Sequence, residues 1–208
     1  MDRQAHWQQV YSAKGERDVS WFQESPVVSL RLMEAAGLRL DTCVLDVGGG
    51  ASRLVDALLA KGVGCVCVLD IAGEALTLAQ ARLGSDGGRV QWIVADVTEP
   101  WVAKPVDIWH DRAVFHFLTN ASDRAGYLVQ LRRHLKPGGT AIIATFGPDG
   151  PEKCSGLPVV RYTPEALAEE LGHSFMLVES VPELHHTPHG KTQAFQYARF
   201  VKNGGQRT

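Results

Sequence analysis

Four aspartates stand at the ends of four successive apolar runs in the first half of the chain. They are Asp46, Asp70, Asp96 and Asp111. Each run is short and rich in apolar residues, as buried strands are. Because parallel strands end at the same edge of an open α/β sheet, and ligands collect at that edge, the four carboxylates are expected to converge. The spacing predicts a single ligand site.

The residues around these aspartates indicate the chemistry of the ligand. Gly48–Gly50 follow Asp46, and a bare backbone there admits a ligand close to the unpaired amides of the next helix, which suits a carboxylate. Asp70 is placed to accept hydrogen bonds from a ribose diol, as an acid does in dinucleotide folds at a similar spacing. Asp96 would accept from an adenine amine, with Val97 packing beside the ring.

Short apolar runs alternate with amphipathic helical stretches, which favours parallel βαβ units. The last two strands, with no crossover helix between them, are expected to form an antiparallel hairpin at one sheet edge. The predicted fold class is therefore α/β: a doubly wound, mostly parallel seven-stranded sheet with an antiparallel last strand. The expected strands are 42–47, 64–70, 89–96, 105–111, 140–146, 175–180 and 194–202, and the expected helices are 53–61, 73–84, 123–135 and 164–172.

Composition excludes several classes of protein. Hydrophobic residues make up 45% and charged residues 21% of the 208 residues, as in globular domains. Lys and Arg number 21 against 23 Asp and Glu, with no basic stripe, so no nucleic-acid partner is expected. There is no apolar run of about 20 residues and no apolar signal core at the start, so no membrane partner and a cytoplasmic location are expected.

The four cysteines predict neither a disulfide nor a metal centre. Cys43, Cys65 and Cys67 lie in or beside apolar runs, where a free cysteine behaves as a small hydrophobe. Cys154 lies in a loop rich in Pro and Gly, where its thiol is expected to be exposed. Its spacing from three later histidines matches no zinc pattern; these are His185, His186 and His189.

The segments VLDVGGG, VLDI, VADV and LKPGG, in this order and spacing, resemble the motif series of class I S-adenosylmethionine-dependent methyltransferases. The resemblance runs from Trp7 to Val201. It implies a Rossmann-like methyltransferase fold, S-adenosylmethionine as cofactor and S-adenosylhomocysteine as product. The cofactor-binding residues that it implies, together with Trp21 as a stacking residue, are Asp46, Gly48, Gly49, Gly50, Asp70, Ile71, Asp96, Val97 and Trp21.

The turn after the first strand departs from the family pattern at one position. Ser52 stands where many relatives have a third glycine, and its hydroxyl is expected to cap the helix that begins at Arg53. A nicotinamide-binding turn would need a glycine at Arg53, so an NAD-dependent oxidoreductase is the less favoured reading. A protein that binds the cofactor without catalysis is a further alternative. It would not need the acceptor-side segment that follows the fourth strand, so the presence of that segment argues against it.

That segment, WHDRAVFHFL, carries the expected catalytic residues His110, Asp111 and Arg112. We expect Arg112 to orient the acceptor or stabilise its anionic form, and Asp111 to position Arg112 or take a proton. Methyl transfer is an in-line displacement that depends on alignment and needs a base only when the acceptor carries a proton. His116 and Phe115 are expected to pack rather than catalyse.

Two branches of the family share features with this chain. A W-D-R-G segment and an aromatic-Gln element, like Trp21 to Gln23 here, are typical of thiopurine and small-thiol methyltransferases. Elongation-factor lysine methyltransferases carry W-x-x-x-Y and W-F-x-E arrangements, which Trp7, Tyr11 and Trp21 to Glu24 also fit. The long loop FGPDGPEKCSGLP favours a small, soft nucleophile over a protein lysine as the acceptor. The oligomeric state is left open.

The chain is expected to form one methyltransferase domain over residues 1–208. Residues 1–40 would be a helical lid or flank, 42–146 the cofactor-binding core, and 147–208 an acceptor loop, a helix and the edge hairpin. The amino-terminal segment is too aromatic for a solvated tail, so residues 1–24 are expected to close over the donor, with Trp21 and Gln23 facing inward. The alternative is that this segment only packs on the outer helices.

Overall fold

A seven-stranded mixed sheet forms the centre of the molecule. The structure is a computed structural model that describes residues 2–13 and 15–204; residues 1, 14 and 205–208 of the predicted domain lie outside the described residues. The strand order is β3-β2-β1-β4-β5-β9-β8. The strands of the sheet are β1 (Cys43–Val47), β2 (Cys65–Asp70), β3 (Val90–Val94), β4 (Val106–Arg112), β5 (Leu135–Phe146), β8 (Phe175–His186) and β9 (Thr192–Lys202).

The predicted fold class is confirmed. Strands β3, β2, β1, β4 and β5 pair in parallel, whereas β9 is antiparallel to both β5 and β8. The chain moves outward from β1 to β3 and then returns to place β4 on the other side of β1. This reversal is the switch point at which open α/β sheets bind ligands, beyond the carboxyl ends of the central strands.

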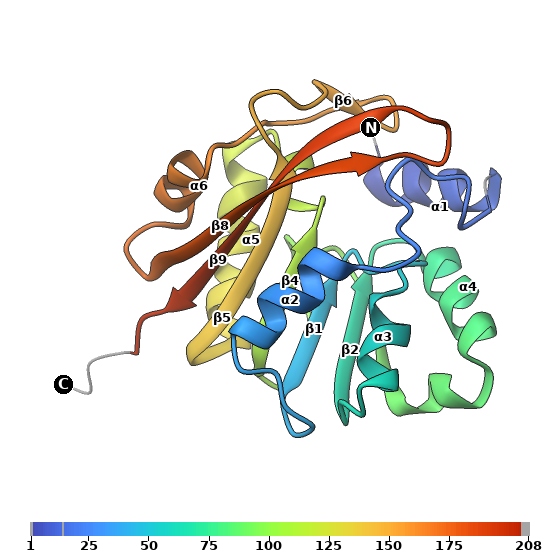
Figure 1. The fold of residues 1–208 in the computed structure, drawn as a ribbon, viewed down its shortest axis with the longest axis horizontal. Coiled ribbons are helices and arrows are strands. Elements are labelled where there is room, and N and C mark those ends of the chain that lie inside the picture. The colour runs from blue at the N-terminus through green and yellow to red at the C-terminus, as the bar shows by residue number, and fades with distance from the viewer. Residues whose placement is uncertain (1, 14, 205–208) are drawn as a thin grey trace.

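Helices cover both faces of the sheet, as a doubly wound fold requires. One core joins the sheet to α2 (Val27–Ala35), α3 (Leu54–Ala60) and α4 (Gly73–Leu83). A second core on the other face joins it to α5 (Ala121–His134) and α6 (Pro164–Leu171). Figure 1 shows α2 in front of the sheet and α5 behind it. The expected packing roles of Phe115 and His116 are confirmed, because both are buried, and Trp101 and Trp109 are buried as well.

The remaining elements lie around this sandwich. Helix α1 (Arg3–Ala13) precedes the sheet and packs beside α4 (Figure 1). Two 3-10 turns, η1 (Gly84–Arg89) and η2 (Phe115–Phe117), precede β3 and follow β4. Strands β6 (Lys153–Cys154) and β7 (Leu157–Pro158) pair within the long loop after β5. That pairing buries Cys154, so the expected exposure of its thiol is wrong.

Two strands are longer than the sequence predicts. Strand β5 begins at Leu135 rather than 140, taking over the Lys-Pro-Gly-Gly segment expected to close a helix. Strand β8 continues to His186 instead of ending at 180, because it pairs with β9 along its whole length. The extended β8–β9 hairpin reaches over the sheet toward α1 (Figure 1). Pairing, which the local pattern does not encode, decides both lengths.

Cys43 and Cys65 form a disulfide, so the expectation that they are free cysteines is wrong. The two residues are direct partners in the parallel pairing of β1 with β2, and their Cα atoms lie 4.5 Å apart. That separation is within the range that a disulfide bridges. The register of two strands, which brings the thiols together, is not readable from the apolar runs. None of the described helices is long and apolar enough to cross a membrane.

Candidate functional site

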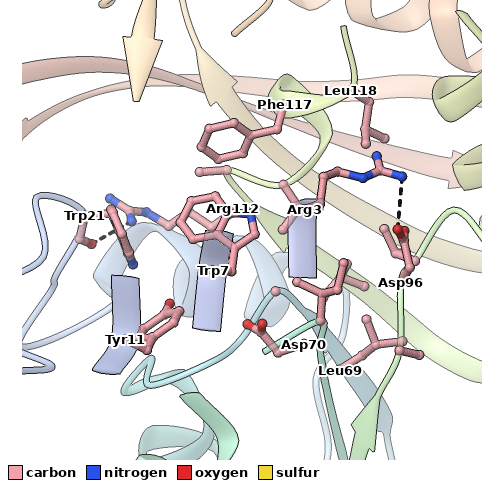
Figure 2. A pocket seen from close by; sticks show the side chains of 17 residues that line it. Arg3, Trp7, Tyr11, Trp21, Leu69, Asp70, Asp96, Arg112, Phe117 and Leu118 are labelled. Atoms are coloured by element: carbon pink, nitrogen blue, oxygen red, sulfur yellow. Dashed lines mark hydrogen bonds and ion pairs between the residues drawn. The ribbon is translucent and has the colours of Figure 1, made fainter. Parts of the chain in front are cut away.

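A cavity lies at the carboxyl edge of the sheet, at the switch point between β1 and β4. Its floor comes from the ends of the parallel strands and its cover from the amino-terminal segment (Figure 2). It is lined by Arg3, Trp7, Tyr11, Trp21, Val47, Gly48, Leu69, Asp70, Ile71, Ala95, Asp96, Val97, Arg112, Ala113, Val114, Phe117 and Leu118. Six of the nine residues expected to bind the cofactor are in this set: Gly48, Asp70, Ile71, Asp96, Val97 and Trp21.

Asp70, the expected ribose ligand, ends β2 and is buried, with its Oδ1 accepting a hydrogen bond from the Ala72 amide. Burial, with a smaller contribution from Asp46, raises the pKa of Asp70 to about 7. Gly50 allows this arrangement, because a Cβ there would lie 2.9 Å from Asp70 Oδ2 and 2.8 Å from the Tyr11 hydroxyl. The absence of a side chain at Gly50 therefore lets the backbone of the glycine turn pack directly against the Asp70 carboxylate.

Asp96, the expected adenine ligand, is held by partners on both oxygens. Its Oδ1 accepts hydrogen bonds from the amide and hydroxyl of Thr98, and its Oδ2 accepts one from Arg3 at 3.0 Å. Arg3 also pairs with Asp123 at 3.2 Å. Figure 2 shows the Arg3 side chain reaching Asp96 from α1. The first turn of α1 is thereby anchored to the outer end of the cavity.

Aromatic rings from the amino-terminal segment meet one ring from the segment after β4. Trp7 lies edge-on to both Trp21 and Phe117, with ring centroids 5.7 Å and 5.1 Å away. Tyr11 packs against Trp21 at 6.2 Å. The faces of aromatic rings attract cations in a dry environment. This cluster can therefore accommodate a positively charged group near Gly48.

A second cavity adjoins the first and shares Tyr11, Trp21, Gly48 and Arg112 with it. We call it the inner chamber. Its remaining lining comes from the lid, α2, the turn after β1 and the end of β4, and consists of Glu16, Val19, Phe22, Gln23, Pro26, Ser29, Asp46, Gly49, Ala51, Ser52, Arg53, Leu54 and His110. The Ser52 hydroxyl accepts a hydrogen bond from the Leu54 amide, but α3 begins at Leu54 with Arg53 as its N-cap, so Ser52 lies one position before the expected capping position.

His110 lies between Asp46 and Ser29 at the base of the inner chamber. His110 on β4 is the direct partner of Asp46 on β1, and its Nδ1 lies 2.7 Å from Asp46 Oδ1. Its Nε2 lies 2.9 Å from the hydroxyl of Ser29 on α2. All three residues are buried. Asp46 Oδ2 is buried without a hydrogen-bond partner among the described residues, so one carboxylate oxygen is available to a ligand.

Arg112 joins the lid to the edge hairpin at the mouth of both cavities. Its Nη1 donates to the carbonyl of Trp21 and its Nε to the hydroxyl of Tyr197, each at 2.9 Å. The guanidinium stacks over Phe195 and lies 3.7 Å from Glu183 Oε2. Its Nη2 makes no hydrogen bond within the described chain. One buried N–H group of a fixed cation thus remains available.

Further contacts hold the lid segment 15–24 closed. Glu16 forms ion pairs with Arg53 and Arg82 beside the glycine turn. Gln23 donates to Glu183 at 2.9 Å, and the carbonyl of Ser20 lies 2.8 Å from His185 Nε2. Trp21 and Gln23 both line the inner chamber, which is where the sequence places them. The lid is therefore attached to α3, α4 and the β8–β9 hairpin.

Asp111 is not brought to either cavity. Successive side chains of a strand point to opposite faces, so His110 and Arg112 face the inner chamber while Asp111 faces the core on the other side. Its carboxylate accepts hydrogen bonds from the amides of Val114 and Phe115 and from the hydroxyl of Tyr127. This placement corrects the expectation that Asp111 acts on the acceptor or positions Arg112: it instead supports the turn after β4.

This placement makes a prediction about stability. Tyr127 is fully buried, donates to Asp111 at 2.8 Å and accepts from the Trp109 indole at 2.8 Å. Tyr127→Phe leaves the Trp109 indole N–H unsatisfied and removes one of the hydrogen bonds to Asp111, which is expected to cost about 1–3 kcal/mol of unfolding free energy. Thermal unfolding should show a fall of roughly 2–4 °C per kcal/mol. Turnover of the folded enzyme should stay within about threefold of wild type. A loss as large as that caused by removing a general acid or base would instead indicate that Asp111 takes part in catalysis.

Several residues of the site carry no signal in the sequence. Arg3, Ser29 and Tyr197 lie outside every motif, and only the packing of α1, α2 and β9 brings them in. His116 is a poor general base, because burial lowers its pKa to about 3. Among the described residues, no group of three or more His, Cys, Asp or Glu side chains is arranged to hold a metal ion.

Part of the chain is similar to one family of known proteins. Residues 44–139 match the sequence profile of a family described as a methyltransferase domain. The match spans β1 to the beginning of β5 and thus includes the glycine turn, Asp70, Asp96 and the segment after β4. A comparison with curated proteins found no similar sequence.

Solved structures share the whole fold at low identity. A S-adenosylmethionine-dependent methyltransferase from Anabaena variabilis is 15% identical, with a TM-score of 0.78, covering 98% of this chain and 96% of that one. A structure described for the conversion of a disulfide bond into a thioacetal group during echinomycin biosynthesis is 17% identical, with a TM-score of 0.75, covering 97% and 92%. The N-methyltransferase NodS from Bradyrhizobium japonicum, bound to S-adenosylhomocysteine, is 18% identical, with a TM-score of 0.66, covering 94% and 97%.

Proposed function

We propose that the chain is an S-adenosylmethionine-dependent methyltransferase of class I and that its acceptor is a small molecule with a soft, thiol-like nucleophile. Likeness of fold does not choose between acceptors, because the similar structures include both an N-methyltransferase and a protein described for sulfur chemistry. The choice rests on the closed inner chamber and on the charge of the groups that line it.

The residues of the first cavity, together with the glycine turn and Asp46 beside it, fit the donor. A bare turn at Gly48–Gly50, a buried acid at Asp70 and an unpartnered oxygen on Asp46 provide a cradle, a diol acceptor and an amine acceptor. When bound, S-adenosylmethionine supplies an electrophilic methyl group on a sulfonium. Trp7, Trp21 and Phe117 surround the neighbouring space with aromatic rings, which favour that cation and exclude water from the reaction.

One observation carries the proposed acceptor class: the inner chamber is covered by the lid segment 15–24, which α3, α4, β4, β8 and β9 all hold in place. A small molecule can be enclosed there after a short opening of the lid. A lysine on a folded protein would have to enter with its own backbone outside, which requires the lid contacts to stay broken during transfer. The closed arrangement therefore favours a small acceptor.

Arg112 accounts for the soft nucleophile in this proposal. Its Nη2 is buried and makes no hydrogen bond to the part of the chain that is described, while its other nitrogens are fixed. A positioned cation stabilises the anionic form of an acceptor, and the thiolate is the reactive form of a thiol. A protonated lysine, by contrast, would be repelled by the guanidinium as it entered the chamber.

The proposal is tested by supplying both kinds of acceptor to the same enzyme. Purified protein with methyl-labelled S-adenosylmethionine is incubated separately with a panel of alkyl and aromatic thiols and with folded lysate proteins. Transfer to one or more thiols, with no label on protein, is the expected result. Label on protein lysines and none on the thiols would replace the proposal with a protein lysine methyltransferase. Asp70→Ala, which removes the expected donor ligand, is the control for dependence on the site.

A further inference from the structure

Ser29 is the one hydroxyl of α2 that reaches the base of the inner chamber. Its side chain is 1% exposed, lines that chamber and lies 2.9 Å from His110 Nε2. The helix packs across the face of the sheet, which brings Ser29 to a residue 81 positions later in the chain. Nothing in the motif series points to this serine.

Both ring nitrogens of His110 are occupied. A carboxylate such as Asp46 only accepts hydrogen bonds, so His110 Nδ1 carries the proton directed at Asp46 Oδ1. The Nε2 atom is then the acceptor, and the Ser29 hydroxyl donates to it. An acceptor molecule in the chamber therefore cannot reach a free ring nitrogen of His110. It can reach the oxygen of Ser29, which lines the chamber.

We propose that Ser29 relays the proton of the methyl acceptor to His110. The acceptor gives its proton to Ser29 Oγ as the Ser29 hydroxyl proton moves to His110 Nε2. The electron pair left on the acceptor forms the bond to the methyl carbon, and the sulfonium sulfur keeps the pair of the broken bond as a neutral thioether. His110 becomes an imidazolium that Asp46 stabilises, and it returns the proton to solvent after product release. This inference rests on the proposed function.

The surroundings of the imidazole favour this direction of proton movement. Asp46 on β1 pairs with the ring and attracts its positive form, while Ser29 on α2 is uncharged. Arg112, two residues along β4, faces the same chamber, and the Asp111 carboxylate lies on the opposite face of that strand. On β9, the Tyr197 hydroxyl accepts from Arg112 and interacts with Ser29. Arg112 thus steadies the acceptor anion while the proton leaves toward Asp46.

The relay matters only for an acceptor that still carries its proton. Two thiols separate this role from a structural one: 2-mercaptoethanol, which is protonated at about pH 7, and 4-nitrothiophenol, which is ionised there. Ser29→Ala is expected to lower kcat/KM for 2-mercaptoethanol about 100-fold and for 4-nitrothiophenol less than about threefold. The deficit with 2-mercaptoethanol should shrink as the pH rises toward the pKa of the thiol, where ionisation no longer needs a relay.

Two variants serve as controls. Ser29→Thr keeps a hydroxyl and should restore most of the rate with 2-mercaptoethanol. Ser122→Ala makes the same chemical change in the first turn of α5, on an exposed residue outside both cavities, and should leave both rates unchanged. An equal loss with both thiols in Ser29→Ala, or no loss with either, would overturn the relay.

A measurement that needs no catalytic turnover tests the relay even if the proposed class of acceptor is wrong. Nitrogen-15 NMR of histidine-labelled enzyme with S-adenosylhomocysteine reports which nitrogen of His110 is protonated, and Ser29→Ala identifies the resonance that responds. The relay requires a protonated Nδ1 and an unprotonated Nε2. A protonated Nε2 over the pH range of activity would overturn it. If wild-type enzyme methylates neither thiol, the proposed acceptor fails while this measurement still decides the role of Ser29.

Discussion

Arg112→Ala is expected to lower methyl-transfer turnover by about 100- to 1,000-fold while S-adenosylmethionine affinity changes only a few fold. The guanidinium, which lines the inner chamber, holds the lid through the Trp21 carbonyl, and its Nη2 makes no hydrogen bond to the described residues, its ionic partner being Glu183 at 3.7 Å. Removing one preorganised donor from a developing anion costs about that factor in rate. The donor keeps Asp70 and the glycine turn in this variant, so its binding is largely preserved.

Single-turnover rates and calorimetric donor titrations, measured on the same samples, check this split. Arg199→Ala is the matched control: Arg199 lies on β9 and pairs with Glu179 of the same hairpin, away from both cavities. It should weaken the hairpin without a comparable loss of turnover. If donor binding collapses in Arg112→Ala while the rate per bound donor stays normal, Arg112 serves the lid alone.

Asp70→Ala is expected to weaken S-adenosylmethionine binding about 10- to 100-fold. The buried carboxylate at the end of β2 is the acid that faces the first cavity beside the glycine turn. Losing charge-assisted hydrogen bonds to a ribose diol removes about 1.5–3 kcal/mol. Titration calorimetry measures the effect directly. Unchanged donor affinity in Asp70→Ala would remove the assignment of the ribose to this residue.

The pH dependence of donor binding provides a second readout for Asp70. Burial raises the pKa of Asp70 to about 7 in the free protein, and the ionised form is the one that accepts two hydrogen bonds. Donor affinity should therefore rise with pH up to about 7 and level off above it. In Asp70→Asn, which has no proton to lose, affinity should be lower and flat with pH over this range.

The folding stability contributed by Asp70 should fall as pH rises, whereas donor affinity should increase. Because the pKa of Asp70 in the folded state exceeds the usual aspartate value of 3.8, the folded state binds the proton more tightly than the unfolded state. The contribution of Asp70 to stability is therefore lost as pH rises from about 4 to about 7. Asp70→Asn is expected to unfold at a higher temperature than wild type at neutral pH, in the absence of donor.

The convergence of acids and glycines at one edge of the sheet could be predicted because it depends on local patterns. Apolar runs, acids and glycines occur in a fixed order, and the parallel βαβ arrangement then requires the strand ends to meet at one edge. This reasoning placed Asp70, Asp96 and Gly48 in one cavity, where the structure has them. It also anticipated Trp21 and Gln23 on the inside of the lid, because aromatic residues before the first strand need an apolar face to cover.

The direction of individual side chains and the register of strand pairing could not be predicted from the sequence. WHDR supplies three candidate groups in a row, but a strand sends alternate residues to opposite faces, so Asp111 faces Tyr127 in the core. Which face holds the chamber depends on where α2 and the lid pack. The disulfide between Cys43 and Cys65 likewise depends on the register of β1 with β2.

The sequence by itself determined the fold class and the convergence of Asp70 and Asp96 at one edge of the sheet, because these follow from periodicity and from spacing within neighbouring βαβ units. Only the tertiary structure decided the groups around the acceptor. His110 meets Asp46 across 64 positions and Ser29 across 81, and Arg112 meets Tyr197 across 85. Contacts at such separations form when whole helices and strands pack together, and no local pattern of residues specifies them.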